Sequence, residues 1–397
     1  MQTTLPVRRT EWLTLALAYA GFIGLGLINS RLNVAWPDMR ATFGLPIDAL
    51  GVLLIANTIG YGIASAGSGR LVAQMNLGVI LAASCGIAGA GMIATGAAPS
   101  WILLIALSAC IGIGAGAIDA SLNAHAAAHF SPRVTNWLHA CFGIGATLGP
   151  AIMTVAVAGN LGWRAGFVVL GAIQIALAIC YALTRGHWTG GIAHTGASKV
   201  ASGPPLAATL RLPVMWLGIL IFFASTGVGV SAGQWIYSLL TESRGVSPAV
   251  AGAWASMFWG STAIGRVLFG FVVQRVAPLR VLWWSMAGTV LGTLLLWVNI
   301  TPWLTFFAIA LLGLMMAPQF PLLISATPRY LGREHAANGI GLQVAAAGPG
   351  AVVVAGLIGV LAERVGLEVV GPSLVIMALV TTGLFALLAR RMQEGKQ

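Results

Sequence analysis

Twelve long apolar segments dominate the sequence and limit what it can fold into. A helix needs about 20 apolar residues to cross the ~30 Å hydrocarbon core of a bilayer. The segments of this kind lie near residues 12–36, 48–68, 78–97, 101–129, 137–159, 164–184, 213–238, 249–272, 281–300, 303–325, 338–362 and 369–389. They are continuous runs without the alternation of transmembrane β-strands. We therefore predict an all-α integral membrane protein with twelve transmembrane helices.

The composition argues against the main soluble classes of protein. Only 7% of the 397 residues are charged, whereas about a quarter are charged in soluble domains. The net charge of +11 comes from Lys and Arg in short gaps between apolar segments, so we expect no nucleic-acid partner. The four cysteines lie inside apolar segments, which predicts neither a disulfide framework nor a metal site. No phosphate-binding loop or catalytic cluster is evident, so we expect no cofactor and no enzymatic activity.

The positions of Lys and Arg predict how the chain is oriented. Most of them fall in inner segments if the N-terminus is inside, as the positive-inside rule requires. Both termini are then cytoplasmic, and the short loops favour a bacterial inner membrane. The longest polar stretch follows the sixth apolar segment. We therefore divide the chain into an N-terminal six-helix bundle (1–185), a cytoplasmic linker (186–211) and a C-terminal six-helix bundle (212–397).

An internal repeat relates the two halves. A constant shift, which carries residue 44 onto residue 245, aligns them without a gap for over forty residues. The matched pairs are Gly44 and Gly245, Gly51 and Gly252, Gly69 and Gly270, and Leu81 and Leu282. Parallel repeats of six helices are typical of transporters that alternate access around a site near the membrane midplane.

One inner loop resembles a known family signature. Gly265-Arg266, then Gly270-Phe-Val-Val-Gln-Arg275 and Arg280, resembles the inner-loop signature of the major facilitator superfamily. The matching loop of the first half keeps Gly69-Arg70 but lacks the family's usual Asp. The resemblance implies a two-bundle transporter fold. It also implies a conformational role for four arginines, Arg70, Arg266, Arg275 and Arg280.

Within that superfamily, a second stretch resembles the fucose permease group of sugar:proton symporters. It runs Gly112-Ile-Gly-Ala-Gly-Ala-Ile-Asp119-Ala-Ser-Leu-Asn123, continues with Asn136-Trp-Leu-His139 and closes with Gly149-Pro150. In that group the acid four residues before the Asn takes part in proton coupling, and a polar side chain at the position of His139 contacts sugar. The resemblance therefore implies roles for Asp119, Asn123 and His139.

Asp119 is the carboxylate placed deep in an apolar segment. A charge there costs at least about 2.5 to 3.5 kcal/mol, so it normally faces the bundle interior or a wet cavity. It lies about 27 Å along the helix from Trp101 at 1.5 Å per residue, between the midplane and the inner leaflet. Asn123 and His139 reach a similar depth, so the three could share a cavity in which Asp119 and His139 exchange a proton. The alternative is that Asp119 only locks neighbouring helices together.

Two features depart from the fucose permease pattern or stand outside it. Asn33 occupies the position of the group's second acid, and Gly227-Val-Gly229 stands where many members have a Glu, which leaves proton coupling open.

Arg31 lies about 28 Å along the first helix from Trp12. We therefore expect Arg31 to lie near the outer headgroups, where it snorkels or packs against neighbouring helices, at a different depth from Asp119. The alternative is a role in an outer gate or in solute contact.

The remaining embedded polar and aromatic residues are candidates for solute binding. Sugar sites combine hydrogen-bonding amides with aromatic faces, whereas the alternative for each residue is helix packing or interfacial anchoring. The candidates are Asn29, Asn33, Asn123, Gln234, Trp235, Trp259, Gln319, Asn338 and Gln343.

These patterns together predict a secondary transporter of a small polar solute, a sugar or polyol, that works by alternating access with proton coupling through Asp119. One alternative is a proton-driven exporter of drugs or metabolites, and another is an uncoupled uniporter. The expected partners are the solute, protons and the lipid bilayer, and we expect a monomer.

Overall fold

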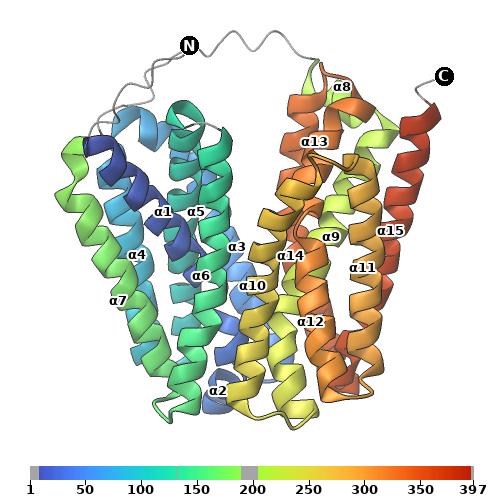
Figure 1. The fold of residues 1–397 in the computed structure, drawn as a ribbon. Coiled ribbons are helices and arrows are strands. Elements are labelled where there is room, and N and C mark those ends of the chain that lie inside the picture. The colour runs from blue at the N-terminus through green and yellow to red at the C-terminus, as the bar shows by residue number, and fades with distance from the viewer. Residues whose placement is uncertain (1–8, 131, 189–203, 395–397) are drawn as a thin grey trace. The chain divides into compact units, whose positions relative to one another are not determined.

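The computed structural model describes residues 9–130, 132–188 and 204–394, which form helices and turns without a β-strand (Figure 1). Twelve helical segments in these ranges are long and apolar enough to span a bilayer, which confirms the predicted all-α membrane fold. They are Trp12–Phe43, Ile47–Ser65, Leu77–Ala97, Trp101–Ala126, Trp137–Ala158, Gly162–Leu183, Pro213–Ser243, Pro248–Val272, Pro278–Val298, Pro302–Leu331, Asn338–Val365 and Leu367–Met392.

The first of two compact units comprises Met1–Arg31 and Leu53–Thr195. Helix α4 packs against both α5 and α7, and α1 packs against α6. Glycines allow the α1–α6 approach, because a methyl group at Gly26 would overlap the Phe142 carbonyl and one at Gly145 would overlap the Ile23 carbonyl. Its helices are α1 (Arg9–Asn29), α3 (Leu50–Gln74), α4 (Leu77–Ala97), α5 (Trp101–His129), α6 (Pro132–Ala158) and α7 (Gly162–Leu183).

The second unit comprises Leu32–Val52 and Gly196–Gln397. Its longer elements are α2 (Arg31–Phe43), α9 (Pro213–Ser238), α10 (Pro248–Val272), α11 (Pro278–Val298), α12 (Pro302–Met316), α13 (Gln319–Leu331), α14 (Ala336–Val365) and α15 (Val370–Glu394). Its short elements are η1 (Ile47–Ala49), α8 (Leu206–Leu210), η3 (Leu239–Ser243) and η4 (Leu367–Val369). The short turn η2 (Arg185–His187) belongs to the first unit.

The two units repeat the same helix contacts. The packing of α1 on α6, α4 on α5 and α4 on α7 recurs as α9 on α14, α11 on α12 and α11 on α15. Gly44 and Gly245, which the sequence repeat aligns, both have left-handed backbone, with φ of 63° and 64°. Glycine adopts this conformation without steric cost, so the same residue ends the same turn in both halves.

Two of the predicted spans are broken helices. The first span divides at Ser30 into α1 and α2, and the tenth divides at Ala317 and Pro318 into α12 and α13. Ser30 Oγ donates to the Gly26 carbonyl at 3.0 Å, a side-chain contact that bends helices, and Pro318 has no N–H for the helical ladder.

The segment Leu32–Val52 belongs to the second unit although it lies early in the chain. Arg40 at the end of α2 pairs with Glu242 of η3. The Ile47 backbone N–H donates to Glu363 of α14 at 2.7 Å. Two glutamates of the C-terminal half thus hold the loop that connects the first two spans.

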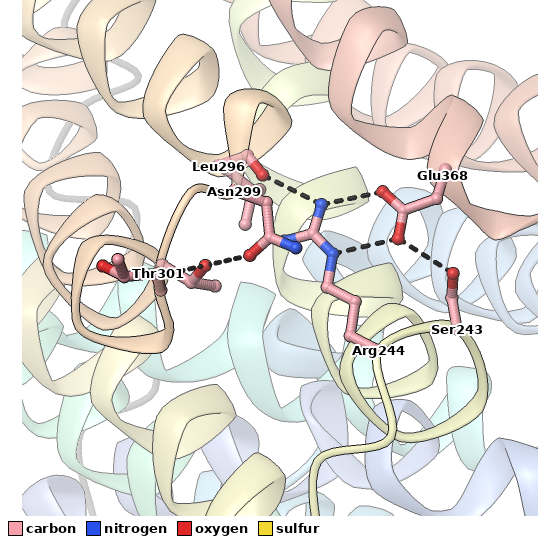
Figure 2. A network of polar contacts seen from close by, with 7 residues as sticks. Ser243, Arg244, Leu296, Asn299, Thr301 and Glu368 are labelled. Atoms are coloured by element: carbon pink, nitrogen blue, oxygen red, sulfur yellow. Dashed lines mark hydrogen bonds and ion pairs between the residues drawn. The ribbon is translucent and has the colours of Figure 1, made fainter.

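An arginine network fixes one end of the second unit (Figure 2). Arg244 Nε and Nη2 donate to the two carboxylate oxygens of Glu368 at 3.0 and 2.8 Å. Nη2 also donates to the Leu296 carbonyl at 2.9 Å, and Ser243 Oγ donates to Glu368 at 2.8 Å. The network joins the turn after α9 to the end of α11 and the start of α15.

We expect Arg244→Ala to lower the free energy of unfolding by about 2 to 3 kcal/mol, because it leaves a buried carbonyl and a carboxylate without their charged donor. The side chain of Arg244 is only 6% exposed. Thermal unfolding of the purified protein in detergent measures the effect. Arg364→Ala removes an exposed arginine of α14 and should leave the midpoint unchanged. Equal midpoints for the two variants would contradict a stabilising role for the network.

Candidate functional site

Asp119 of α5 is half-buried, and each of its carboxylate oxygens accepts a hydrogen bond from a side chain. The Tyr61 hydroxyl on α3 donates to Oδ2. The Asn123 amide, one turn further along α5, donates to Oδ1 at 2.8 Å. These donors stabilise the negative charge inside the first unit. The carboxyl group therefore stands in a polar site at the interface of two helices, and the roles of Asp119 and Asn123 in proton coupling and solute binding stay predictions.

Glycines of α5 bring α3 close enough for this contact. A methyl group at Gly112 would overlap the Asn57 carbonyl, and one at Gly116 would overlap the Tyr61 carbonyl. Ser65, the next residue on the same face of α3, donates to the Gly116 carbonyl at 3.3 Å. The glycine-rich run before Asp119 thus sets the separation at which Tyr61 reaches the carboxylate.

Sequence reasoning missed Asn57 and Tyr61 as members of the site. The signal was present, because Asn57, Tyr61 and Ser65 follow one another at intervals of four residues within the second apolar segment. This spacing places them on one helix face. A polar stripe along an otherwise apolar helix indicates a buried polar interface.

Arg31 is packed inside the protein, which is one of the two roles that the sequence analysis expects for it, and it does not snorkel. Its side chain is only 2% exposed and does not reach headgroups. Nη1 donates to the Ile28 carbonyl and Nη2 donates to Asn57 Oδ1 at 3.0 Å. The cause is the helix break at Ser30, because Arg31 folds back onto a carbonyl left open at the end of α1. A straight helix, which the depth estimate assumed, has no such open carbonyl at this point.

The structure places two other predicted residues away from these contacts. His139 of α6 is exposed, and its ring packs edge-on against Phe22 of α1 with centroids 5.2 Å apart. Asn29 is exposed and donates to the Leu25 carbonyl of its own helix at 3.0 Å. Proton exchange between Asp119 and His139 stays a prediction, and the described contacts of His139 do not add to it.

Three predicted residues meet around Gly233 in the second unit. Asn33 of α2 donates to the Gly233 carbonyl at 3.1 Å, and the indole of Trp259 on α10 packs against Gly233. Gln234 follows Gly233 in α9 and is 6% exposed. The Gln234 amide nitrogen and the Trp259 indole nitrogen are buried without a hydrogen-bond partner. Buried donors are normally paired, so these two N–H groups are suited to a solute oxygen.

Four other predicted residues have their polar atoms engaged within the second unit. Trp235 donates to the Ala355 carbonyl at 3.0 Å. The Gln319 amide is paired with side chains of α9 and α11, and the Gln343 amide is paired with side chains of α13. Asn338 donates to Thr209 of α8 at 3.1 Å. Their contact with solute stays a prediction, whereas their packing role is observed.

The four arginines of the loop motifs lie in different surroundings. Arg266 is half-buried in α10, whereas Arg275 and Arg280 are exposed around the turn between α10 and α11. The side chain of Arg70 lies outside the described residues. Among the side chains that the structure describes, no three His, Cys, Asp or Glu residues cluster in a way that could hold a metal ion.

Comparison with known proteins gives matches over the whole length of the chain. The sequence profile of the Major Facilitator Superfamily matches residues 12–240 and 236–397. Sodium-dependent glucose transporter 1 of Homo sapiens is 23% identical in an alignment of 354 residues that covers 78% of this chain and 66% of that protein. Bypass of stop codon protein 6 of Saccharomyces cerevisiae is 25% identical in an alignment of 177 residues. This alignment covers 42% of this chain and 36% of that protein. The chain covers less than two-thirds of the length of either relative.

Solved structures share the fold. A bacterial homologue of the human lysosomal transporter Spinster, in an inward-facing and occupied conformation, has a TM-score of 0.79 at 14% identity over 97% of this chain and 98% of that one. FucP in the outward conformation has a TM-score of 0.63 at 16% identity, over 96% and 99% of the two chains. Likeness at these identities concerns the architecture alone.

Proposed function

The chain belongs to the Major Facilitator Superfamily, as its inner-loop motif predicts, and from this premise we propose that it is a secondary transporter of a small polar solute. The solute is a sugar, a polyol or a related compound, and protons are the coupling ion. Asp119 carries the proton, while the two repeated halves alternate access to the solute. The protein acts as a monomer in a bacterial inner membrane, with both termini in the cytoplasm.

The contact of Tyr61 and Asn123 with Asp119 is the observation that carries this proposal. An ionisable side chain inside a membrane bundle is expensive and normally functional. A hydroxyl group is both donor and acceptor, so Tyr61 donates to the ionised carboxylate and accepts from the protonated one. The pair can therefore stay hydrogen-bonded in both protonation states of the carboxyl group.

The donors around Asp119 favour a proton over a metal cation at this site. Hard cations take several oxygen ligands at once. The Asp119 oxygens instead face an O–H and an N–H group, which donate hydrogen bonds and do not supply a ring of acceptors. Sodium appears in the name of the human relative, but the two donors at Asp119 support a proton as the coupling ion in this chain.

The unpaired N–H groups of Gln234 and Trp259 support the choice of solute. They are uncharged donors, which suit the hydroxyl and ring oxygens of a sugar. The human relative is named for glucose, which belongs to the same class. Counterflow in proteoliposomes with labelled D-glucose, D-mannitol and the amphipathic cation ethidium tests the solute class, since an exporter of drugs would exchange only the last.

We expect Trp259→Phe to raise the KM for the transported sugar about 5- to 10-fold, since it removes one hydrogen bond worth about 1 to 1.5 kcal/mol. Trp235→Phe is the matched control, because that indole N–H is already paired with the Ala355 carbonyl. It should lower thermal stability and leave KM unchanged. Initial rates of counterflow measure both, and an unchanged KM in Trp259→Phe would remove this residue from the solute site.

A further inference from the structure

The positive charge of Arg31 is not explained by the contacts that the side chain makes. A guanidinium has five N–H donors, and two of them serve the Ile28 carbonyl and the Asn57 amide oxygen. The Nε–H group is buried and has no partner. A neutral glutamine also carries two N–H donors, which is as many as the two acceptors need. The structural role alone therefore requires an amide and not a cation.

A buried cation without a counter-ion is costly inside a membrane bundle. Among the described side chains, no carboxylate forms an ion pair with Arg31. Asp119 does not serve this purpose, because its two oxygens already accept from Tyr61 and Asn123. The first unit thus keeps a buried cation that meets a carbonyl at the end of α1 but pairs with no described carboxylate.

We propose that Arg31 binds the carboxylate of an acidic solute, and that the solute class is therefore the sugar acids. This inference rests on the proposed transport function. The planar guanidinium matches a carboxylate with two parallel N–H···O bonds, and three of its five N–H groups are not used by Ile28 or Asn57. Arg31 is covered in this structure, so the solute binds when alternating access uncovers the side chain.

The position of Asn57 links this site to Asp119. Asn57, which binds Arg31, and Tyr61, which binds Asp119, are one turn apart on α3, a rise of about 6 Å. When Asp119 takes up a proton, its negative charge disappears from the same helix interface. An anion at Arg31 is then repelled less, so protonation of Asp119 raises the affinity for the acid. Proton and acid therefore bind together, as symport requires.

Binding of D-glucuronate and of D-glucose to the purified full chain in detergent tests this proposal, because the two probes differ at a single carbon. Sodium acetate and acetamide form a second, smaller acid and neutral pair. Intrinsic tryptophan fluorescence reports binding at constant ionic strength. We expect wild-type protein to bind at least one of the two acids at least tenfold more tightly than the neutral compound of the same pair.

Arg31→Gln should lose this preference, because it keeps two donors and removes the charge. Arg211→Gln, at an exposed arginine, should keep the preference. Asp119→Asn should bind the acid more tightly than wild type, because it removes the negative charge that repels the acid. The Asp119→Asn measurement keeps the test decisive if Arg31→Gln does not fold.

Wild-type protein that binds neither acid more tightly than its neutral partner, or an Arg31→Gln variant that retains the preference, would overturn the proposal. The assay measures binding alone and needs no proton gradient. If no preference for acids is found, the proposal of proton-coupled transport through Asp119 still stands. If proton coupling is not found, the preference for acids can still be measured.

Discussion

Asp119→Asn is expected to abolish accumulation of solute against its gradient while counterflow at equal pH continues. The asparagine side chain has the same shape, and its oxygen still accepts from the hydroxyl or amide that contacts Asp119. What it loses is the ability to exchange a proton, so the imposed pH gradient no longer drives uptake. Proteoliposomes with an inwardly directed proton gradient measure the accumulated solute.

Glu334→Gln supplies the matched control for this experiment. It makes the same carboxyl-to-amide change at a side chain that is 74% exposed. The control should accumulate solute as wild type does. If Asp119→Asn also accumulates solute as wild type does, Asp119 is not the coupling site. If wild type itself fails to accumulate solute under a proton gradient, protons do not drive uptake by this chain.

Gly112→Ala is expected to destabilise the first unit by about 3 kcal/mol or more, because the added methyl group overlaps the backbone carbonyl of Asn57. Backbone cannot rotate away as a side chain can, so α3 and α5 must separate. The separation also draws Tyr61 away from Asp119, since both contacts lie along the same helix pair. Transport should therefore fall further than the loss of folded protein explains.

Gly62→Ala is the control for added volume on α3. A methyl group at Gly62 meets no atom within 4 Å, and the residue is exposed. Gly62→Ala should not destabilise the protein, because alanine in a helix with room for its methyl group is about 0.5 to 1 kcal/mol more favourable than glycine. Thermal unfolding in detergent, followed by transport per folded molecule, separates the two variants. Similar unfolding midpoints for Gly112→Ala and Gly62→Ala would show that the α3–α5 contact is looser than the structure indicates.

The sequence predicts the architecture well because the bilayer sets strict limits on helix length and polarity. Each apolar segment corresponds to a spanning helix, and the repeat that aligns Gly44 with Gly245 reappears as the same turn geometry. The break at Ser30 was not predicted, since a single serine in an apolar run carries no strong signal. The division between the two units falls close to this break, after Arg31, and the Arg31 side chain is buried.

The site is predicted only where local geometry decides it. Asp119 and Asn123 are four residues apart on one helix, so their contact follows from helix periodicity. The contact of Tyr61 with Asp119 joins two helices, and nothing in the single sequence fixes the rotation of one against the other. Arg31 shows the same limit, because its partner Asn57 lies on another helix.

The glutamines of the second unit show why solute residues are harder to predict. Gln234 and Gln319 are both buried in apolar helices and look alike in sequence. Gln319 finds hydroxyl partners in Ser225 and Thr289, whereas the Gln234 amide nitrogen finds none. The difference depends on which side chains surround each amide after folding, so residue type and burial alone cannot separate a packing role from a binding role.

Infrared difference spectroscopy tests most directly whether Asp119 exchanges a proton, and it needs no knowledge of the solute. Wild type and Asp119→Asn in lipid are compared as the pH is lowered from about 8 to about 3, the range over which carboxyl groups take up protons, and bands common to the two proteins are subtracted. We predict that wild type gains a protonated-carboxyl C=O band that Asp119→Asn lacks, and that Tyr61→Phe shifts this band. Identical difference spectra for wild type and Asp119→Asn would contradict proton coupling through Asp119.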